Sequence, residues 1–192
     1  MTWVEEISDI ARKAARWLDL TDEDLAVLKA NGEILLRASD RMVDAILNAI
    51  LSDEFLVERV KEAGLTVEKA RELLRSVVEL SISGGYDEEH AKRVAIIGLA
   101  HARRGIPRFS MVLAAGVALS TILGALAEEG ALTGPLAAAI CKSVAWHLCV
   151  MLESYEIAEA VAVEKAAGIS KGLYRRLVRV GAEEAYKTLK PS

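Results

Sequence analysis

Residues 83–116 read SGGYDEEHAKRVAIIGLAHARRGIPRFSMVLAAG, and their pattern determines the predicted fold. Three acidic residues at 87–89 precede an apolar run, and Arg103 and Arg104 follow it, so the charges at both ends suit the dipole of a helix. Gly105 and Pro107 then end this helix and start another, because glycine tolerates a left-handed cap and proline cannot extend the preceding helix. The stretch therefore predicts two consecutive helices joined by a tight corner.

The chain on either side of this stretch has the same helical character. Apolar residues recur at every third or fourth position, and Ala, Leu, Glu, Lys and Arg fill the remaining places. Thr21 with Asp24 forms a capping-box pattern, and Asn31-Gly32 marks a break. Further helices are expected over 3–18, from 21, over 34–51, from 66 to about 82, over 108–129, from 135 to about 167, and in a polar tail from 168. The predicted fold class is all-α.

Length, composition and charge limit the possible functions. A chain of 192 residues has the size of one domain, and 53% hydrophobic residues are enough for a compact core. A net charge of -4, without a run of Lys and Arg among aromatic residues, argues against a nucleic-acid partner. The N-terminus is acidic and lacks the features of a signal peptide, so we expect a cytoplasmic protein.

The most apolar segment, 111–127, carries no charge and approaches the minimum length for crossing a bilayer. The alternative is a helix of the core or of a dimer interface. We favour this alternative, because Ala and Gly dominate the segment, Ser120 and Thr121 lie within it, and Arg108 and Glu128 bound it closely. No membrane span is predicted.

Few residues are available for catalysis. The chain has three histidines and two cysteines, and it contains neither a GxSxG nor a phosphate-loop motif, so we expect no enzyme. Cys141 and Cys149 are about 12 Å apart if they share one helix, which is too far for a disulfide. The cysteines and histidines also lack zinc-site spacing.

The three histidines differ in their surroundings. His90, next to Glu89, is typical of a polar residue on the surface at the start of a helix. His147 is typical of a hydrogen-bonded imidazole in a core or an interface. His101 ends the apolar run VAIIGLAHARRGIP, where a flat apolar cofactor could lie against Ile97 and Gly98. From these residues alone, two roles of His101 stay open: a structural histidine and a metal ligand.

Several segments resemble the globin domain of globin-coupled sensors and the related protoglobins. The segments LTDEDLAVLKANGEIL (20–35), VDAILNAILSDEFL (43–56) and LAAAICKSVAWHLCVMLESYEIA (136–158) are similar to helices of that family, and the last ends near a characteristic Tyr, here Tyr155. The His-and-corner segment 83–116 is the specific part of the resemblance. It implies a globin fold with an additional N-terminal helix, divided into 1–19 (extra helix), 20–167 (globin sensor domain) and 168–192 (tail helix).

The resemblance implies a haem b site with His101 as the iron ligand. Lys92, Arg103 and Arg104 become candidate partners of the haem propionates, with a solvated helix end as the alternative. The residues expected to bind the cofactor are Ile46, Leu47, Leu73, Val77, Ile97, Gly98, Arg104 and Phe109.

The chain departs from the family at the distal side of this site. Ile46 and Leu47 replace the usual Phe-Tyr pair, Leu73 is expected on the facing helix, and Phe109 is followed by Ser110. The distal pocket should therefore be dry and apolar. Because O₂ needs a hydrogen-bond donor and CO does not, we expect weak or rapidly oxidised O₂ binding with normal CO binding.

The resulting expectation is a sensor or carrier of a diatomic gas (O₂, CO or NO), with a possible separate signalling partner. Homodimerisation is expected through the long helices at 108–129 and 135–167, whose apolar surfaces include Leu113, Val117, Ile140, Val144 and Leu148. The alternative function is a haem-free, globin-like interaction or regulatory module whose pocket is filled by side chains or binds a lipid-like ligand.

Overall fold

The computed structural model describes residues 2–190, and within them it consists of helices and connecting turns without strands. The nine helices are α1 (Trp3–Trp17), α2 (Asp22–Ala30), α3 (Gly32–Leu51), α4 (Glu54–Glu62), α5 (Val67–Ser83), α6 (Glu88–Arg103), α7 (Arg108–Glu128), α8 (Gly134–Ala167) and α9 (Lys171–Leu189). This confirms the predicted all-α class.

Most helix boundaries follow from local capping. The side chains of Thr21 and Thr66 accept hydrogen bonds from backbone N–H groups at the starts of α2 and α5, and Asp87 does the same for α6. Gly105 has a φ of +64°, as predicted for the corner between α6 and α7. The short helix α4, which Asp53 caps, was not predicted from the sequence.

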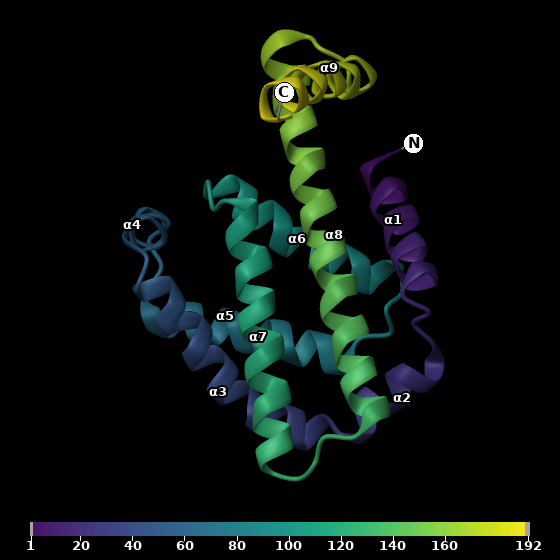
Figure 1. Ribbon diagram of the computed structural model, residues 1–192, viewed down its shortest axis with the longest axis vertical. Helices are drawn as coiled ribbons and strands as arrows, with labels where there is room; N and C mark the ends of the chain where they lie inside the picture. The colour runs from purple at the N-terminus through teal and green to yellow at the C-terminus, as the bar shows by residue number, and fades with distance from the viewer. Residues whose placement is uncertain (1, 191–192) are drawn as a thin grey trace.

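The helices form a globin-like sandwich (Figure 1). α7 and α8 run side by side, and α5 crosses behind them. α3 packs against α7, and α6 packs against α8. The last of the described helices, α9, lies across the far end of α8, at one end of the molecule.

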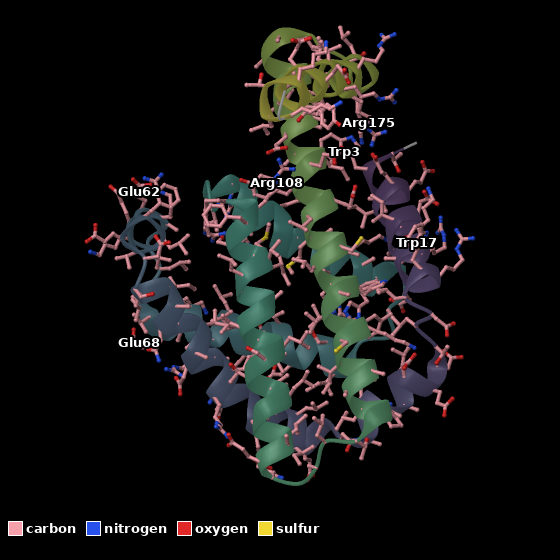
Figure 2. The ribbon with its side chains drawn as sticks, viewed as in Figure 1. Trp3, Trp17, Glu62, Glu68, Arg108 and Arg175 are labelled. Atoms are coloured by element: carbon pink, nitrogen blue, oxygen red, sulfur yellow. The ribbon has the colours of Figure 1, made fainter. Side chains whose placement is uncertain are left out.

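The N-terminal helix α1 is part of the core. Ile7, Ala11 and Ala14 of α1 are buried with α6 and α8 around Trp146, whose indole N–H donates to the carbonyl of Ala11 at 3.0 Å. The outer side of α1 carries Trp17, which is 92% exposed (Figure 2). The helix expected as an addition to the globin domain therefore shares that domain's hydrophobic interior.

The two long helices hide more apolar surface than the sequence indicated. Ile140 is buried in the core, so its expected place on a dimer surface is wrong. Val144 and Leu148 are half-buried and line an apolar cavity. Val117 packs against the core between α3 and α5, whereas Leu113 is 63% exposed.

By length and composition, α7 and α8 could each cross a membrane. Both also contribute buried residues to the core, and the buried helices of a globular domain have the same length and composition.

Candidate haem site

Six helices, α2, α3 and α5 to α8, enclose an apolar cavity of about 190 Å³. Its walls run from Met111 to Ile122 on α7 and from Ile140 to Met151 on α8. The two ends of each span are eleven positions apart, or about 16 Å along the helix. The cavity is thus long and apolar, with room for a flat ligand between the helices.

His101 enters this cavity from the last turn of α6. Its Nδ1 is 2.8 Å from the carbonyl oxygen of Ile97, and because a carbonyl only accepts, Nδ1 carries the proton. Among the described residues no partner contacts Nε2. Burial lowers the pKa of His101, and the nearby charge of Arg104 adds to this shift, so the ring is neutral near pH 7. Its lone pair at Nε2 is therefore available to a ligand.

Gly98 brings the histidine-bearing helix close to α8. A Cβ at this position would lie 2.2 Å from Ser154 Oγ and 2.3 Å from the carbonyl oxygen of Met151. Only a glycine allows this approach of the two helices. Gly98 therefore faces α8, whereas the sequence had placed it against the cofactor, and it positions the turn that carries His101.

The structure brings together some of the predicted site residues. Ile46, Val77 and Ile97 line the cavity with His101. On α5, Leu74 lines the cavity, whereas the expected Leu73 is 44% exposed. Successive residues of a helix are rotated by about 100°, so the sequence pattern had misjudged the facing side of α5 by one residue.

The other predicted residues lie outside the cavity lining. Leu47 is buried in the core between α3 and α5, and Phe109 is 55% exposed. Arg104 donates to the carbonyl of Ala100, and Lys92 pairs with Glu88 at 2.8 Å. Arg103 is exposed as well. The described cavity lining therefore contains neither Lys nor Arg. The structure therefore offers no lining residue as a propionate partner.

A polar cluster borders the cavity near the start of α6, and the sequence had missed its key member. His90 is buried at 2% exposure, which corrects its assignment to the surface. Its Nε2 is 2.9 Å from Nε2 of His147, whose Nδ1 lies 2.7 Å from the carbonyl of Ser143. The backbone N–H of Tyr86 points to Nδ1 of His90 at 3.4 Å.

These contacts determine the protonation of both rings. The carbonyl of Ser143 accepts, so His147 is protonated at Nδ1 and accepts at Nε2. His90 therefore donates from Nε2 and accepts at Nδ1. Burial lowers the pKa of His90 to about 4 and that of His147 to about 3, and both rings are neutral.

His147 is a poor candidate for an iron ligand, although it lines the cavity. Both of its nitrogens have partners, which confirms the predicted hydrogen-bonded core imidazole. His90, its partner, is eleven residues before His101 on α6, or about 16 Å along the helix. His90 thus lies well away from His101 along α6, and it does not line the cavity.

The sequence contains one sign of this cluster, the glycine pair 84–85. A Cβ on Gly84 would lie 1.6 Å from Nδ1 of His90, so the glycine pair 84–85 makes room for the imidazole. Tyr86 also belongs to the cluster, because its hydroxyl donates to the carbonyl of Ser81 and contacts Ser143 Oγ. Burial raises the pKa of Tyr86 to about 12, so this hydroxyl keeps its proton.

The cavity has the donor that a haem requires. One neutral imidazole offers a lone pair at its edge, and the other ring nitrogen is held by a backbone carbonyl, as is usual for metal-bound histidines. The remaining lining near His101 is apolar. His101 is the one histidine of the described chain that fits an axial ligand.

Comparison with known proteins identifies the family of the chain. The family model for Protoglobin matches residues 8–160, which is 153 of the 192 residues and includes His101. The match begins within α1 and ends within α8. No curated protein matches the chain at a significant level.

Proposed function

The chain belongs to the protoglobin family of globin-type, haem-binding proteins, and on that premise we propose that it holds haem b through His101 and binds a diatomic gas. The observation that carries the proposal is the state of His101. Its ring is neutral, its Nδ1–H is held by Ile97, and its Nε2 is without a partner among the described residues beside an apolar cavity.

Each part of the site has a definite task in this proposal. His101 Nε2 supplies the lone pair, and the carbonyl of Ile97 fixes the ring in one orientation and one tautomer. A bound haem supplies iron with an open position for a neutral gas. Ile46, Leu74 and Val77 exclude water and offer no hydrogen-bond donor, so the site favours CO over O₂. This is a binding function, and no turnover is proposed.

The test uses the absorption spectrum of the purified chain after haem is offered. We expect a strong Soret band near 400 nm and a five-coordinate ferrous form that binds CO. His101→Gly should change the ferrous spectrum, and added imidazole should restore it, because free imidazole can take the place of the deleted ring. His90→Gln is the matched control, since His90 does not line the cavity, and its haem spectrum should stay unchanged.

Two results would contradict the assignment. The first is a His101→Gly spectrum identical to that of the parent chain. The second is the failure of the folded parent chain to take up haem at all.

A haem-free module with an apolar ligand is the second candidate. The specific observation in its favour is the lack of a basic side chain in the described cavity lining, where haem propionates would need a partner. It predicts purified chain without a Soret band, and an apolar molecule detected by mass spectrometry after solvent extraction.

We further propose that the chain works as a homodimeric gas sensor or carrier, with α7 as the contact between two copies. Phe109, Val112 and Leu113 form an exposed apolar face at the start of this helix. That face directly follows the corner after His101, so a change at the iron could reach the contact through α7. A separate signalling partner would then recognise the altered dimer.

A further inference from the structure

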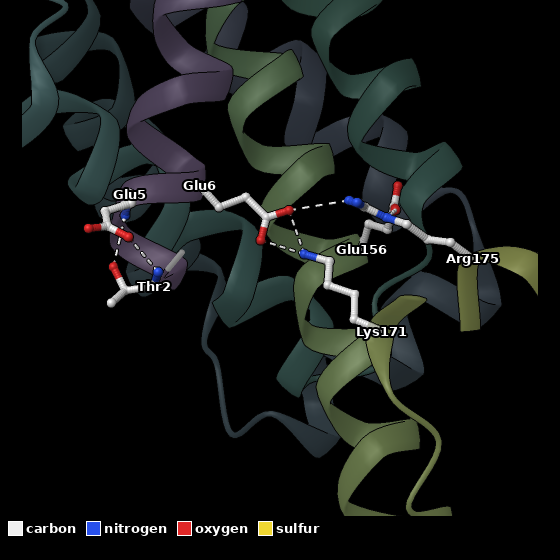
Figure 3. A network of polar contacts seen from close by, with 6 residues as sticks. All are labelled: Thr2, Glu5, Glu6, Glu156, Lys171 and Arg175. Atoms are coloured by element: carbon white, nitrogen blue, oxygen red, sulfur yellow. Dashed lines mark hydrogen bonds and ion pairs between the residues drawn. The ribbon is translucent and has the colours of Figure 1, made fainter. Parts of the chain in front are cut away.

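The C-terminal helix α9 is held to the body of the molecule by its first turns. Glu6 of α1 accepts hydrogen bonds from Lys171 and, at 3.2 Å, from Arg175 (Figure 3). Arg175 also lies 3.9 Å from Glu156 of α8. These ion pairs join α1, α8 and α9 at one place, and they set the direction in which α9 leaves the body.

Beyond these turns, α9 exposes its apolar side chains. Leu177, Val178, Val180, Tyr186 and Leu189 are between 48% and 82% exposed, and Leu173 is 39% exposed. At about 100° per residue, Leu173, Leu177 and Val180 fall in one row along the helix. Exposed apolar rows of this length need a cover, because single exposed residues are common but contiguous ones mark contact sites.

The charge of α9 is opposite to that of the rest of the chain. Lys171, Arg175, Arg176, Arg179 and Lys187 stand against Glu183 and Glu184, so the helix carries 5 − 2 = +3. The whole chain carries -4, which leaves -7 for the remainder. Lys171 and Arg175 pair with the body, and Arg179 borders a groove that Glu156 and Glu159 also line. Arg176 is in none of the described ion pairs, and Lys187 pairs only within α9, with Glu183 and Glu184.

The position of α9 suits a flat, negatively charged surface. The helix lies crosswise at one end of the long axis of the molecule, so a plane can meet its outer side without touching the globin body (Figure 1). Arg108 and Arg175 lie near the same end (Figure 2). A basic amphipathic helix that lies parallel to a surface is the arrangement by which peripheral proteins bind lipid headgroups.

We propose that α9 binds the surface of anionic lipid bilayers, with Leu177 and Val180 entering the headgroup region and Arg176 and Lys187 meeting the lipid phosphates. Burial of the apolar row and attraction of the cations act together, because neither contribution alone holds a short helix on a membrane. The proposal does not depend on the haem.

Co-sedimentation of the full chain with vesicles tests the proposal. The chain should bind vesicles of equimolar phosphatidylcholine and phosphatidylglycerol, bind phosphatidylcholine vesicles weakly, and dissociate as salt rises. A double variant, Arg176→Gln with Lys187→Gln, should weaken binding by roughly tenfold or more, because each cation near an anionic membrane contributes about 1 kcal/mol. Leu177→Gln with Val180→Gln should also abolish binding.

The matched control removes two cations from α1 instead. Arg12→Gln with Arg16→Gln makes the same change in net charge, and it should leave vesicle binding unchanged. An equal loss in this control would overturn the proposal, and so would equal binding to both kinds of vesicle. If Leu177→Gln with Val180→Gln instead lowers the oligomeric mass of a chain that ignores vesicles, the cover is a second copy and the proposal is wrong. Circular dichroism and the haem spectrum verify that each variant is folded.

Discussion

His90 and His147 form a buried pair of imidazoles in which every ring nitrogen has a partner in one directional chain. Tyr86 N–H donates to His90, His90 donates to His147, and His147 donates to the carbonyl of Ser143. A second proton on His147 would put two donors face to face at 2.9 Å, and one on His90 would set Nδ1–H against the backbone N–H of Tyr86 at 3.4 Å, in both cases in a buried place. The pair therefore stays neutral, and the fold depends on that neutrality.

The pair predicts a loss of stability in acid. Histidines of the unfolded chain titrate near pH 6.5, whereas the folded pKa values are about 4 and about 3. Between these limits the unfolded chain binds protons that the folded chain excludes, so the free energy of unfolding falls as pH decreases from about 6.5 to about 4. The expected slope is up to about 1.4 kcal/mol per pH unit for each histidine. Urea unfolding at a series of pH values measures it.

His90→Gln separates this effect from other acid effects. The amide can still donate to His147, but it does not titrate, so the slope should decrease by about one proton. His101 has a pKa lowered in the same direction and remains in the variant, which makes the comparison specific to His90. An unchanged slope in His90→Gln would show that the pair does not exclude protons.

At the scale of elements, the contact between α6 and α8 determines where His101, the proposed iron ligand, lies. Gly98 permits the contact, because its missing side chain makes room for Ser154 and the backbone of Met151. The close approach lies one turn before His101, so a displacement of α6 here moves the imidazole relative to the cavity.

Gly98→Ala should therefore destabilise the chain and weaken haem binding together. A methyl group 2.3 Å from a backbone carbonyl cannot be accommodated by a side-chain rotation, so α6 must shift, at about 1–3 kcal/mol. Thermal unfolding and haem titration measure the two effects. Gly116→Ala on α7 is the matched control: its Cβ would meet nothing within 4 Å, and it should stabilise the helix by about 0.4–1 kcal/mol. A Gly98→Ala variant as stable as the parent would remove the positioning role of this contact.

At the scale of the whole molecule, the exposed part of α7 is the surface to test for dimerisation. Phe109 is 55% and Leu113 63% exposed, on a helix whose other side closes the haem cavity. A shared apolar contact between two copies would cover both residues. Ile140 cannot contribute to it, because its side chain is buried in the core.

Leu113→Glu should convert a dimer to a monomer, because it places a charge in an apolar contact. Sedimentation velocity measures the mass, and Leu51→Glu, at an apolar site on α3 that is 51% exposed, should leave it unchanged. A parent chain that is monomeric at high concentration, or a variant that stays dimeric, would reject α7 as the interface.

The features that could be predicted from the sequence are those that depend on neighbours within a few residues. The caps at Thr21, Thr66 and Asp87 and the left-handed Gly105 are local, and they placed the helix ends within one or two residues. The His101 segment could also be recognised from the sequence, because its apolar run and its corner are consecutive in the chain and together resemble a family.

Only the tertiary structure decided which residues meet across the core. His90 has its partner 57 residues away, and Gly98 its neighbours on another helix. The facing side of α5, with Leu74 in place of Leu73, depends on the rotation of that helix against α3 and α8. Local pattern gives the period of a helix but not this rotation, because packing against distant helices selects the buried side from several apolar alternatives.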